Sequence, residues 1–384
     1  AGRRPTALRL LHRDTPGEEG VSEARLSTGL VRLDIGEPDL PTPEHVIAAI
    51  EEALRSGLTR YGPPEGILEL RRAVCEHLAL FGVDAHLDEV LITPGASFAI
   101  YLALKALLRP GDEVLLPTPT WFVYPDLVEV VGGRCTFVRP GPGLRPDVET
   151  LAEAVSPRTR VLVVNTPNNP VGYVLRADEV RALAELAVDH GLFVVSDEVY
   201  KMITYDGLKH VSFASLPELR ERLVLVDSFS KAYRMTGWRL GYLVAPRELR
   251  DKIVRIQAAL LACVPPFVQQ AGLAALRGPQ EHVREMVAEY QARRDLLLDL
   301  LSRLPDVRVV KPEGSFYAFP DLSAYGVKAS ILVARLEQEH GVRLKPGDAF
   351  GPWWDYHVRI SFCRAREELV KGVEKLATLL ESLG

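Results

Sequence analysis

RVLVVNTPNNPVGYVLRADEVRALAELAVDHGLFVVSDEVY, residues 160–200, contains two short valine-rich runs that flank a stretch with helical spacing. The runs at 161–164 and 192–195 are continuously apolar, which is typical of strands buried on both faces of a sheet. Between them, residues 177–190 place apolar side chains three and four positions apart, which predicts an amphipathic helix. This order predicts two parallel strands joined by a crossover helix.

The same alternation extends along the chain in both directions. Short apolar runs alternate with helix-like segments from about residue 89 to about residue 246. We therefore predict an α/β fold with a large domain, residues 51–285, in which helices flank a mainly parallel mixed sheet. The further strand-like runs are EVLIT (89–93), EVLLPTP (113–119), CTFVRP (135–140), RLVLV (222–226) and LGYLVAP (240–246).

The remaining residues follow a different pattern. A long helical region extends to about residue 304, and helix-like segments at 328–341 and 366–383 follow, with short strand-like runs between them. This pattern predicts a smaller α+β domain over residues 286–384. Residues 1–50 contain no apolar core of their own, so we predict an N-terminal arm that belongs in part to the smaller domain.

The composition limits the classes of function. The 384 residues are 47% hydrophobic and 25% charged, as in ordinary globular proteins. A net charge of -5 argues against a nucleic-acid partner, and no apolar run approaches the roughly 18 residues of a membrane span. Cys75, Cys135, Cys263 and Cys363 form no C-x-x-C pair, which argues against a metal site or a disulfide framework and favours a cytoplasmic protein.

Polar side chains follow several of the predicted strands directly. Lys231 comes after RLVLV, Asp197 ends LFVVSD, and the segments NTPNNPVG (165–172) and ITPGASFAI (92–100) each contain a strand and the turn after it. Each feature alone has an ordinary explanation as a solvated lysine, a turn residue or a helix terminus. The ends of parallel strands meet at one edge of a sheet, where α/β proteins bind ligands, so together these features predict one site.

Two nucleotide-binding interpretations are disfavoured. Asp197 and Glu198 at a strand end are compatible with a magnesium-dependent nucleotide hydrolase, but the chain contains no Gly-Lys dipeptide and therefore no phosphate loop. The glycine cluster GPGLRP (141–146) lacks the third glycine of a dinucleotide-binding motif.

Six segments occur along most of the chain in a recognisable order: DIGEPDLPTP (34–43), YGPPEG (61–66), TPNNPVG (166–172), DEVY (197–200), SFSKAYRMTGWRLGY (228–242) and RISF (359–362). Their combination and order resemble the class I/II aminotransferases, which are fold type I pyridoxal 5'-phosphate enzymes. The sequence departs from that family at Arg234, where many members have a small residue, and at Trp353 and Trp354, which replace a more usual glycine-containing turn.

The resemblance implies the role of each residue toward pyridoxal 5'-phosphate. Lys231 would hold the cofactor as a Schiff base, and a desolvated amine beside Arg239 suits a nucleophile and base. Asp197 would face the pyridine nitrogen, while Tyr200 and Asn169 would hydrogen-bond the ring hydroxyl oxygen. Trp121 would stack on the ring. The phosphate would be bound by Gly95, Ala96, Ser97, Ser228, Ser230 and Arg239, and by Tyr61 of the neighbouring subunit.

The resemblance implies fewer of the residues that bind the substrate. Arg359 would bind the substrate carboxylate with two hydrogen bonds, close to Gly36 and Asn169. The resemblance implies a homodimer with shared active sites that transfers an amino group from an L-amino acid to a 2-oxo acid by a ping-pong mechanism. The amino donor is not readable, because no further arginine or lysine stands out as a partner for a second carboxylate.

Other functions of the same family remain open at this point. A β-lyase, a cyclase or an amino-acid oxidase would begin with the same carbanion, so the cofactor residues do not distinguish these enzymes from a transaminase. A non-catalytic sensor is disfavoured, because we expect a sensor to carry a DNA-binding extension, and the sequence ahead of DIGEPD (34–39) is too short to hold one.

Overall fold

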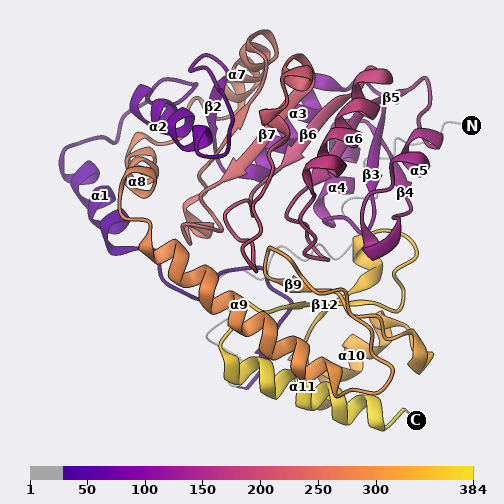
Figure 1. Cartoon of the computed structure of the whole chain (residues 1–384). Helices are drawn as coiled ribbons and strands as arrows, with labels where there is room; N and C mark the ends of the chain where they lie inside the picture. The colour runs from indigo at the N-terminus through magenta and orange to yellow at the C-terminus, as the bar shows by residue number, and fades with distance from the viewer. Residues whose placement is uncertain (1–28, 384) are drawn as a thin grey trace, which may run out of the picture.

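The computed structural model describes residues 29–383, so most of the predicted N-terminal arm and Gly384 lie outside the described residues. A seven-stranded sheet forms the centre of the larger part of the molecule, with strand order β2-β8-β7-β6-β5-β3-β4 (Figure 1). Only β8 is antiparallel to its neighbours within this sheet, which confirms the predicted mainly parallel mixed sheet. The strands are β2 (Val90–Thr93), β3 (Glu113–Pro117), β4 (Arg134–Val138), β5 (Thr159–Asn165), β6 (Phe193–Asp197), β7 (Leu223–Ser228) and β8 (Gly241–Val244).

Helices cover both faces of this sheet (Figure 1). In β5, Val161 and Val163 join one apolar cluster, whereas Leu162 and Val164 join a cluster on the other face. This alternation buries both faces of the parallel strands, which explains why their sequences read as continuous apolar runs. The first cluster includes residues of α3 (Ala96–Leu107), α4 (Val123–Val130) and α7 (Arg247–Leu261), and the second includes residues of α5 (Val148–Glu153) and α6 (Ala177–Asp189).

A further layer of helices packs beside the β2 edge. α1 (Glu44–Arg55) lies against α8 (Pro266–Arg277), and α2 (Leu68–Ala79) contacts the same helix. Val46, Leu70 and Ile92 from these elements and β2 share one apolar cluster.

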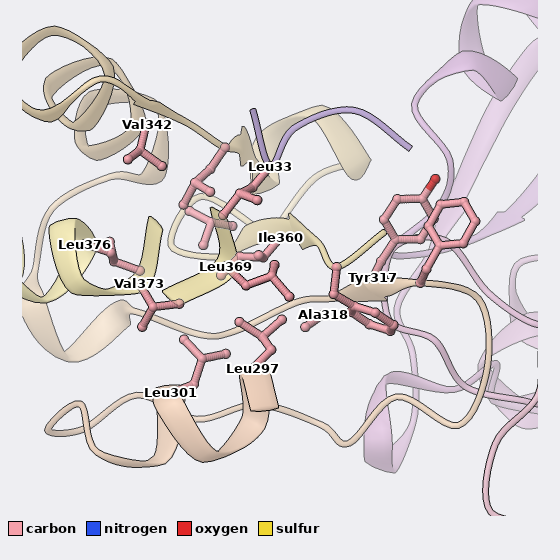
Figure 2. Close-up of a cluster of buried hydrophobic side chains, with 14 of the residues drawn as sticks. Leu33, Leu297, Leu301, Tyr317, Ala318, Val342, Ile360, Leu369, Val373 and Leu376 are labelled. Carbon is pink, nitrogen blue, oxygen red and sulfur yellow. The ribbon is translucent and has the colours of Figure 1, made fainter. Parts of the chain in front are cut away.

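The smaller part of the molecule lies below the sheet and is built on its own apolar core (Figures 1 and 2). Leu297 and Leu301 project from one helix toward Leu369 and Val373 of another, and Ile360 lies next to Leu369 on the side away from Leu297 (Figure 2). Its elements are β1 (Val31–Arg32), α9 (Glu281–Ser302), β9 (Tyr317–Ala318), α10 (Ala329–His340), β10 (Val342–Arg343), β11 (Lys345–Pro346), β12 (Val358–Ser361) and α11 (Arg366–Glu381).

The N-terminal segment reaches this smaller core. Val31 of β1 pairs in parallel with Val342 of β10, and Leu33 lies within the same apolar cluster. After this strand the chain crosses to the larger part, where α1 packs on α8. The helix α9 continues from the larger part into the smaller one (Figure 1).

The described residues show neither a membrane-crossing helix nor a metal-binding cluster. No helix within residues 29–383 combines the length and apolarity that a membrane crossing requires. The same residues contain no cluster of three or more histidine, cysteine, aspartate or glutamate side chains arranged to bind a metal ion. Cys75, Cys135, Cys263 and Cys363 are all free thiols.

Candidate active site

Three neighbouring strands end in polar residues at one edge of the central sheet. Asn165, Asp197 and Ser228 are the last residues of β5, β6 and β7. These strands are parallel neighbours, and Asn165 lies directly opposite Asp197 in the register. The loops that leave the three strands therefore start side by side, and Lys231 lies in the loop after β7.

The Lys231 side chain is partly buried and points back toward the N-terminal segment. Its Nζ atom donates a 2.6 Å hydrogen bond to the main-chain oxygen of Gly36 and lies 5.9 Å from the ring centroid of Tyr200. Burial lowers the pKa of Lys231 from 10.5 to about 8, and the charges of Arg359 and Arg239 act in the same direction. The neutral amine is thus accessible near neutral pH, where it can act as a nucleophile or a base.

The Asp197 carboxylate is buried without a cationic partner among residues 29–383. It accepts hydrogen bonds from the Tyr124 phenol at 2.6 Å and from the Val199 main-chain nitrogen at 3.3 Å. Burial raises the pKa of Asp197 to about 6, while these two hydrogen bonds oppose that rise. Such a carboxylate favours a neighbouring positive charge, because nothing within the described chain neutralises it.

Tyr200 and Tyr317 form a buried pair close to Lys231. Their hydroxyl oxygens lie 2.9 Å apart, and burial is the main reason that the pKa of each phenol is raised. A Cβ atom on Gly36 would lie 1.8 Å from the Tyr317 hydroxyl oxygen. Glycine at position 36 therefore permits the close approach of the N-terminal segment to this pair.

A cradle of main-chain and side-chain donors forms where α3 begins. Gly95 caps this helix with a φ of 84°, and a Cβ atom there would lie 2.4 Å from Nη2 of Arg239. Ser228 and Ser230 are both buried, and the Ser230 main-chain nitrogen donates to Ser228 Oγ at 2.9 Å. Ser228 pairs with Gly241, on which a Cβ atom would lie 3.0 Å from the Gly95 Cα atom, so this serine is close to the start of α3. Free N–H groups at the start of a helix and an arginine together can bind a phosphate. The helix begins at Ala96, followed by Ser97, as predicted.

Arg359 on β12 is buried and held by residues from three segments. Its Nη1 donates to Asn169 Oδ1 at 3.0 Å, and its Nη2 donates to the Asp34 main-chain oxygen at 2.5 Å. The guanidinium carbon lies 4.4 Å from the ring centroid of Tyr317. The Nε atom is buried and has no hydrogen-bond partner within the described residues. This arrangement leaves a donor available for a carboxylate.

Two predicted site residues, Trp121 and Tyr61, make no direct contact with Lys231, Asp197 or Arg359 that the described residues show. Trp121 packs edge to face against Tyr124, with ring centroids 5.2 Å apart, and so lies near Asp197 through that tyrosine. Tyr61 is 88% exposed and is not brought to the other site residues within this chain.

The two departures from the family pattern have separate surroundings. The main-chain oxygen of Arg234 accepts a 2.7 Å hydrogen bond from Thr42 Oγ1, and Arg234 has a positive φ of 56°. Trp353 is stacked against Arg139 with 4.4 Å between the guanidinium carbon and the ring centroid. Trp354 is buried against Phe319. The turn that contains the two tryptophans is thus packed by side chains that glycine could not supply.

The structure adds site residues that the sequence analysis did not single out. Tyr124 lies three residues after Trp121, just inside α4, and its sequence position carries no signal of a contact with Asp197. Asn165 ends a strand in the same way as Asp197, and its Nδ2 donates to the Asp197 main-chain oxygen at 3.0 Å. Tyr317 lies in a two-residue strand with no distinguishing local signal. Lys345, which precedes Pro346, lies directly opposite Arg359 in the β11–β12 ladder.

Comparison with known proteins identifies the family. The family model described as "Aminotransferase class I and II" matches residues 28–376. Aromatic-amino-acid aminotransferase 2 of Thermococcus litoralis is 39% identical over 92% of this chain and 92% of its own length. Aspartate/prephenate aminotransferase of Thermus thermophilus is also 39% identical, over 93% of this chain and 92% of its own length.

Solved structures agree with this sequence relationship. The aromatic aminotransferase from Pyrococcus horikoshii superposes with a TM-score of 0.90 at 37% identity, covering 94% of this chain and 98% of that structure. The aspartate aminotransferase from Thermus thermophilus with maleate gives a TM-score of 0.86 at 38% identity, covering 91% of this chain and 92% of that structure. The chain belongs to the class I and II aminotransferase family and is a pyridoxal-phosphate-dependent transaminase.

Proposed function

We propose that this transaminase carries the amino group of an L-amino acid to a 2-oxo acid at a site formed by Lys231, Asp197 and Arg359. The observation that supports the proposal is the partly buried Lys231 amine, whose pKa of about 8 leaves it reactive near neutral pH. The relatives are named for aspartate, aromatic amino acids and prephenate, so their names leave the donor of this enzyme open.

The residues present fit pyridoxal 5'-phosphate. The uncompensated Asp197 carboxylate suits a protonated pyridine nitrogen, since a buried anion is stabilised by a partner of opposite charge. The exposed guanidinium of Arg239 and the buried hydroxyls of Ser228 and Ser230 suit a phosphate at the start of α3. Gly95 leaves the space that Arg239 occupies in this cradle.

We assign the remaining contacts by their place around this site. Ala96 and Ser97, with Gly95, would bind the phosphate through main-chain N–H groups, and Trp121 would pack on the ring face. Tyr200 and Asn169 would donate hydrogen bonds to the ring hydroxyl oxygen. Asn165 and Tyr124 would act through Asp197, which both of them contact.

When bound, pyridoxal phosphate supplies an electron-withdrawing ring that makes the α-proton of an amino acid acidic. Lys231 Nζ would accept that proton and return it, since a base is most effective when its pKa lies close to the working pH. The Gly36 main-chain oxygen, 2.6 Å from Nζ, would orient the amine.

Arg359 would bind the α-carboxylate in both half-reactions. Asn169 and the Asp34 main-chain oxygen already hold its guanidinium, so little side-chain freedom is lost when a substrate binds. The unpartnered Nε would supply a further hydrogen-bond donor to that carboxylate. One clamp then serves the amino acid and the 2-oxo acid, as a ping-pong reaction requires.

A single-turnover experiment without acceptor tests this function. The enzyme loaded with pyridoxal phosphate should convert one amino acid to its 2-oxo acid in an amount equal to the active sites and then stop. Addition of a 2-oxo acid should restart it. Continuous product formation from one amino acid alone, with release of ammonia or consumption of oxygen, would instead identify a lyase or an oxidase.

We also propose that two copies of the chain form a homodimer in which Tyr61 reaches the phosphate of the partner's site. The segment around Tyr61 contacts the end of α7, because the Gly62 main-chain nitrogen lies 3.2 Å from Cys263 Sγ. Leu58, Leu260 and Leu261 are exposed on these two segments. Exposed leucines on two segments that contact each other favour burial against a second copy.

The domain boundaries and the compartment belong to the same proposal. Residues 51–285 would form the cofactor-binding domain, and residues 286–384 with part of residues 1–50 would form the smaller domain. These limits fall within α1 and α9, so both helices would join the two domains. Four free thiols support a reducing compartment such as the cytoplasm.

A further inference from the structure

Lys345 lies beside the residue that would bind the substrate carboxylate. Strands β11 and β12 are antiparallel, and Lys345 is the direct cross-strand partner of Arg359. Residues directly opposite each other in such a pair project from the same face of the sheet. Two cationic side chains therefore leave this small sheet on the same side.

Both cations contact the same aromatic ring. The Lys345 Nζ atom lies 4.7 Å from the ring centroid of Phe122, and the Arg359 guanidinium carbon lies 6.0 Å from that centroid. Phe122 directly follows Trp121. The ring centroids of Phe122 and Trp121 lie 6.2 Å apart, so the ring that Lys345 and Arg359 share is next to Trp121.

The Lys345 ammonium has neither an ion pair nor a hydrogen bond within residues 29–383. The side chain is half-buried, and burial together with the Arg359 charge lowers the pKa of Lys345. Asp34 and Asp348 oppose that effect only from a distance, and the Asp34 carboxylate is bound by Arg32 at 3.0 Å. In contrast, the buried Lys201 has its counter-ion, Asp227, at 2.6 Å.

An unpaired cation beside a second cation is electrostatically unfavourable until an anion binds between or beside them. Arg359 is already assigned to the α-carboxylate of the substrate. A substrate with a neutral side chain would leave Lys345 unpaired, whereas a substrate with a second carboxylate would neutralise both cations. Only a substrate with a second carboxylate can form this ion pair with Lys345, so the pair would favour such substrates over those with neutral side chains.

We propose that Lys345 is a specificity residue that binds the second carboxylate of dicarboxylic amino acids and 2-oxo acids while Arg359 binds the α-carboxylate. This inference rests on the proposed function of the site. The preferred substrates are then acidic amino acids whose second carboxylate is one or two methylenes beyond the α-carbon. The Phe122 ring supports the ammonium and leaves its N–H groups free for the substrate.

The test compares two amino donors in the single-turnover reaction. The ratio of kcat/KM for L-glutamate to kcat/KM for L-leucine is measured for the wild type, Lys345→Met, Lys345→Arg and Lys371→Met. Lys345→Met should lower the ratio by about 10- to 100-fold, the usual effect of losing a hydrogen bond to a charged group. Lys345→Arg keeps the charge and should retain most of the ratio. Lys371→Met removes an exposed charge from α11 and should not change it.

Three outcomes of this experiment would contradict the inference, and they can be told apart. An unchanged ratio in Lys345→Met, or an equal loss with both donors, would show that Lys345 is structural and overturn the inference. A wild-type enzyme that favours L-leucine or L-phenylalanine over L-glutamate would overturn it as well. If no amino acid, acidic or neutral, aminates the cofactor in the wild type, then transamination itself is wrong and the role of Lys345 is rejected with it.

Discussion

The Tyr124 phenol donates a 2.6 Å hydrogen bond to a carboxylate oxygen of Asp197, and both side chains are buried. Tyr124 lies on α4, whereas Asp197 ends β6, so the contact ties a helix that covers the sheet to the edge where the site is formed. Burial disfavours the ionised carboxylate, and this hydrogen bond partly compensates for it.

Tyr124→Phe should raise the pKa of Asp197 above its value of about 6, because the lost hydrogen bond favours the ionised form. If the cofactor requires ionised Asp197, affinity for pyridoxal phosphate near pH 6 should fall by about tenfold, a typical loss for a hydrogen bond to a charged group. The measurement is a titration of the cofactor-free protein at a series of pH values, which should show the acid limb displaced to higher pH.

Tyr173→Phe is the matched control for this variant. Tyr173 is also buried, and its hydroxyl accepts a 3.1 Å hydrogen bond from Asn168 Nδ2 rather than contacting Asp197. Tyr173→Phe should leave the acid limb of the plot of cofactor affinity against pH unchanged. An equal displacement in both variants would argue against the assigned role of Tyr124.

Asp197→Asn should stabilise the cofactor-free protein at neutral pH while it abolishes turnover. The folded-state pKa of Asp197 is raised from 3.8 to about 6, so its contribution to stability is present below about pH 4 and is lost as the pH rises through 6. Removing this titration should raise the free energy of unfolding at pH 7.5, relative to the difference at pH 4, by roughly 2–3 kcal/mol. Urea unfolding at both pH values measures the effect, and a variant that loses stability at neutral pH would contradict it.

Lys231 should carry the cofactor covalently. After borohydride reduction, peptide mapping should find the pyridoxyl label on Lys231, and a label on Lys201 or Lys209 would refute the assignment. Lys231→Ala should still bind the cofactor through the phosphate cradle but lose turnover by at least about 100-fold, because the proton acceptor is missing. Lys209→Ala removes an exposed lysine and serves as the control.

Gly95→Ala should weaken cofactor binding by about tenfold or more, since its Cβ atom would lie 2.4 Å from Arg239 Nη2 and displace the guanidinium from the phosphate cradle. Gly82→Ala is the comparison, because Gly82 also has a positive φ, 73°, but its added Cβ atom would meet no atom within 4 Å. Both variants should lose some thermal stability from backbone strain. Equal cofactor affinity in the two variants would show that Gly95 serves the helix cap alone.

Tyr61 should complete the site of the partner subunit. Mixing inactive Lys231→Ala with inactive Tyr61→Ala chains produces heterodimers in which one site carries both lesions and the other carries neither. An equal mixture should recover about a quarter of wild-type activity, since half of the dimers are mixed and each has one intact site. Verified heterodimers that remain inactive would place Lys231 and Tyr61 in the same subunit's site.

Much of the fold and the centre of the site follow from local sequence patterns. Continuous apolar runs predicted the parallel strands, because a strand buried on both faces cannot alternate with polar residues. Asp197 and Lys231 could then be placed near one another, because the strands before them end at the same edge of the sheet. The cap at Gly95 was likewise predicted from a strand, a glycine and a helix start.

Contacts between distant segments required the tertiary structure. The Tyr124–Asp197 hydrogen bond joins residues 73 positions apart, and the Tyr200–Tyr317 contact joins residues 117 positions apart. The sequence of a buried tyrosine is the same whether its hydroxyl meets a carboxylate or another phenol. Which of these partners it meets depends on how the helices and the smaller domain pack on the sheet.

The residues assigned to the substrate show most clearly which features follow from the sequence and which require the tertiary structure. The sequence by itself predicted that Arg359 binds a carboxylate, because Arg359 lies in the RISF segment that resembles the family. It did not indicate Lys345, because the register of two short antiparallel strands decides which side chain stands beside that arginine. Register depends on packing and turn geometry across the smaller domain, and that packing leaves the Lys345 charge without a counter-ion among the described residues.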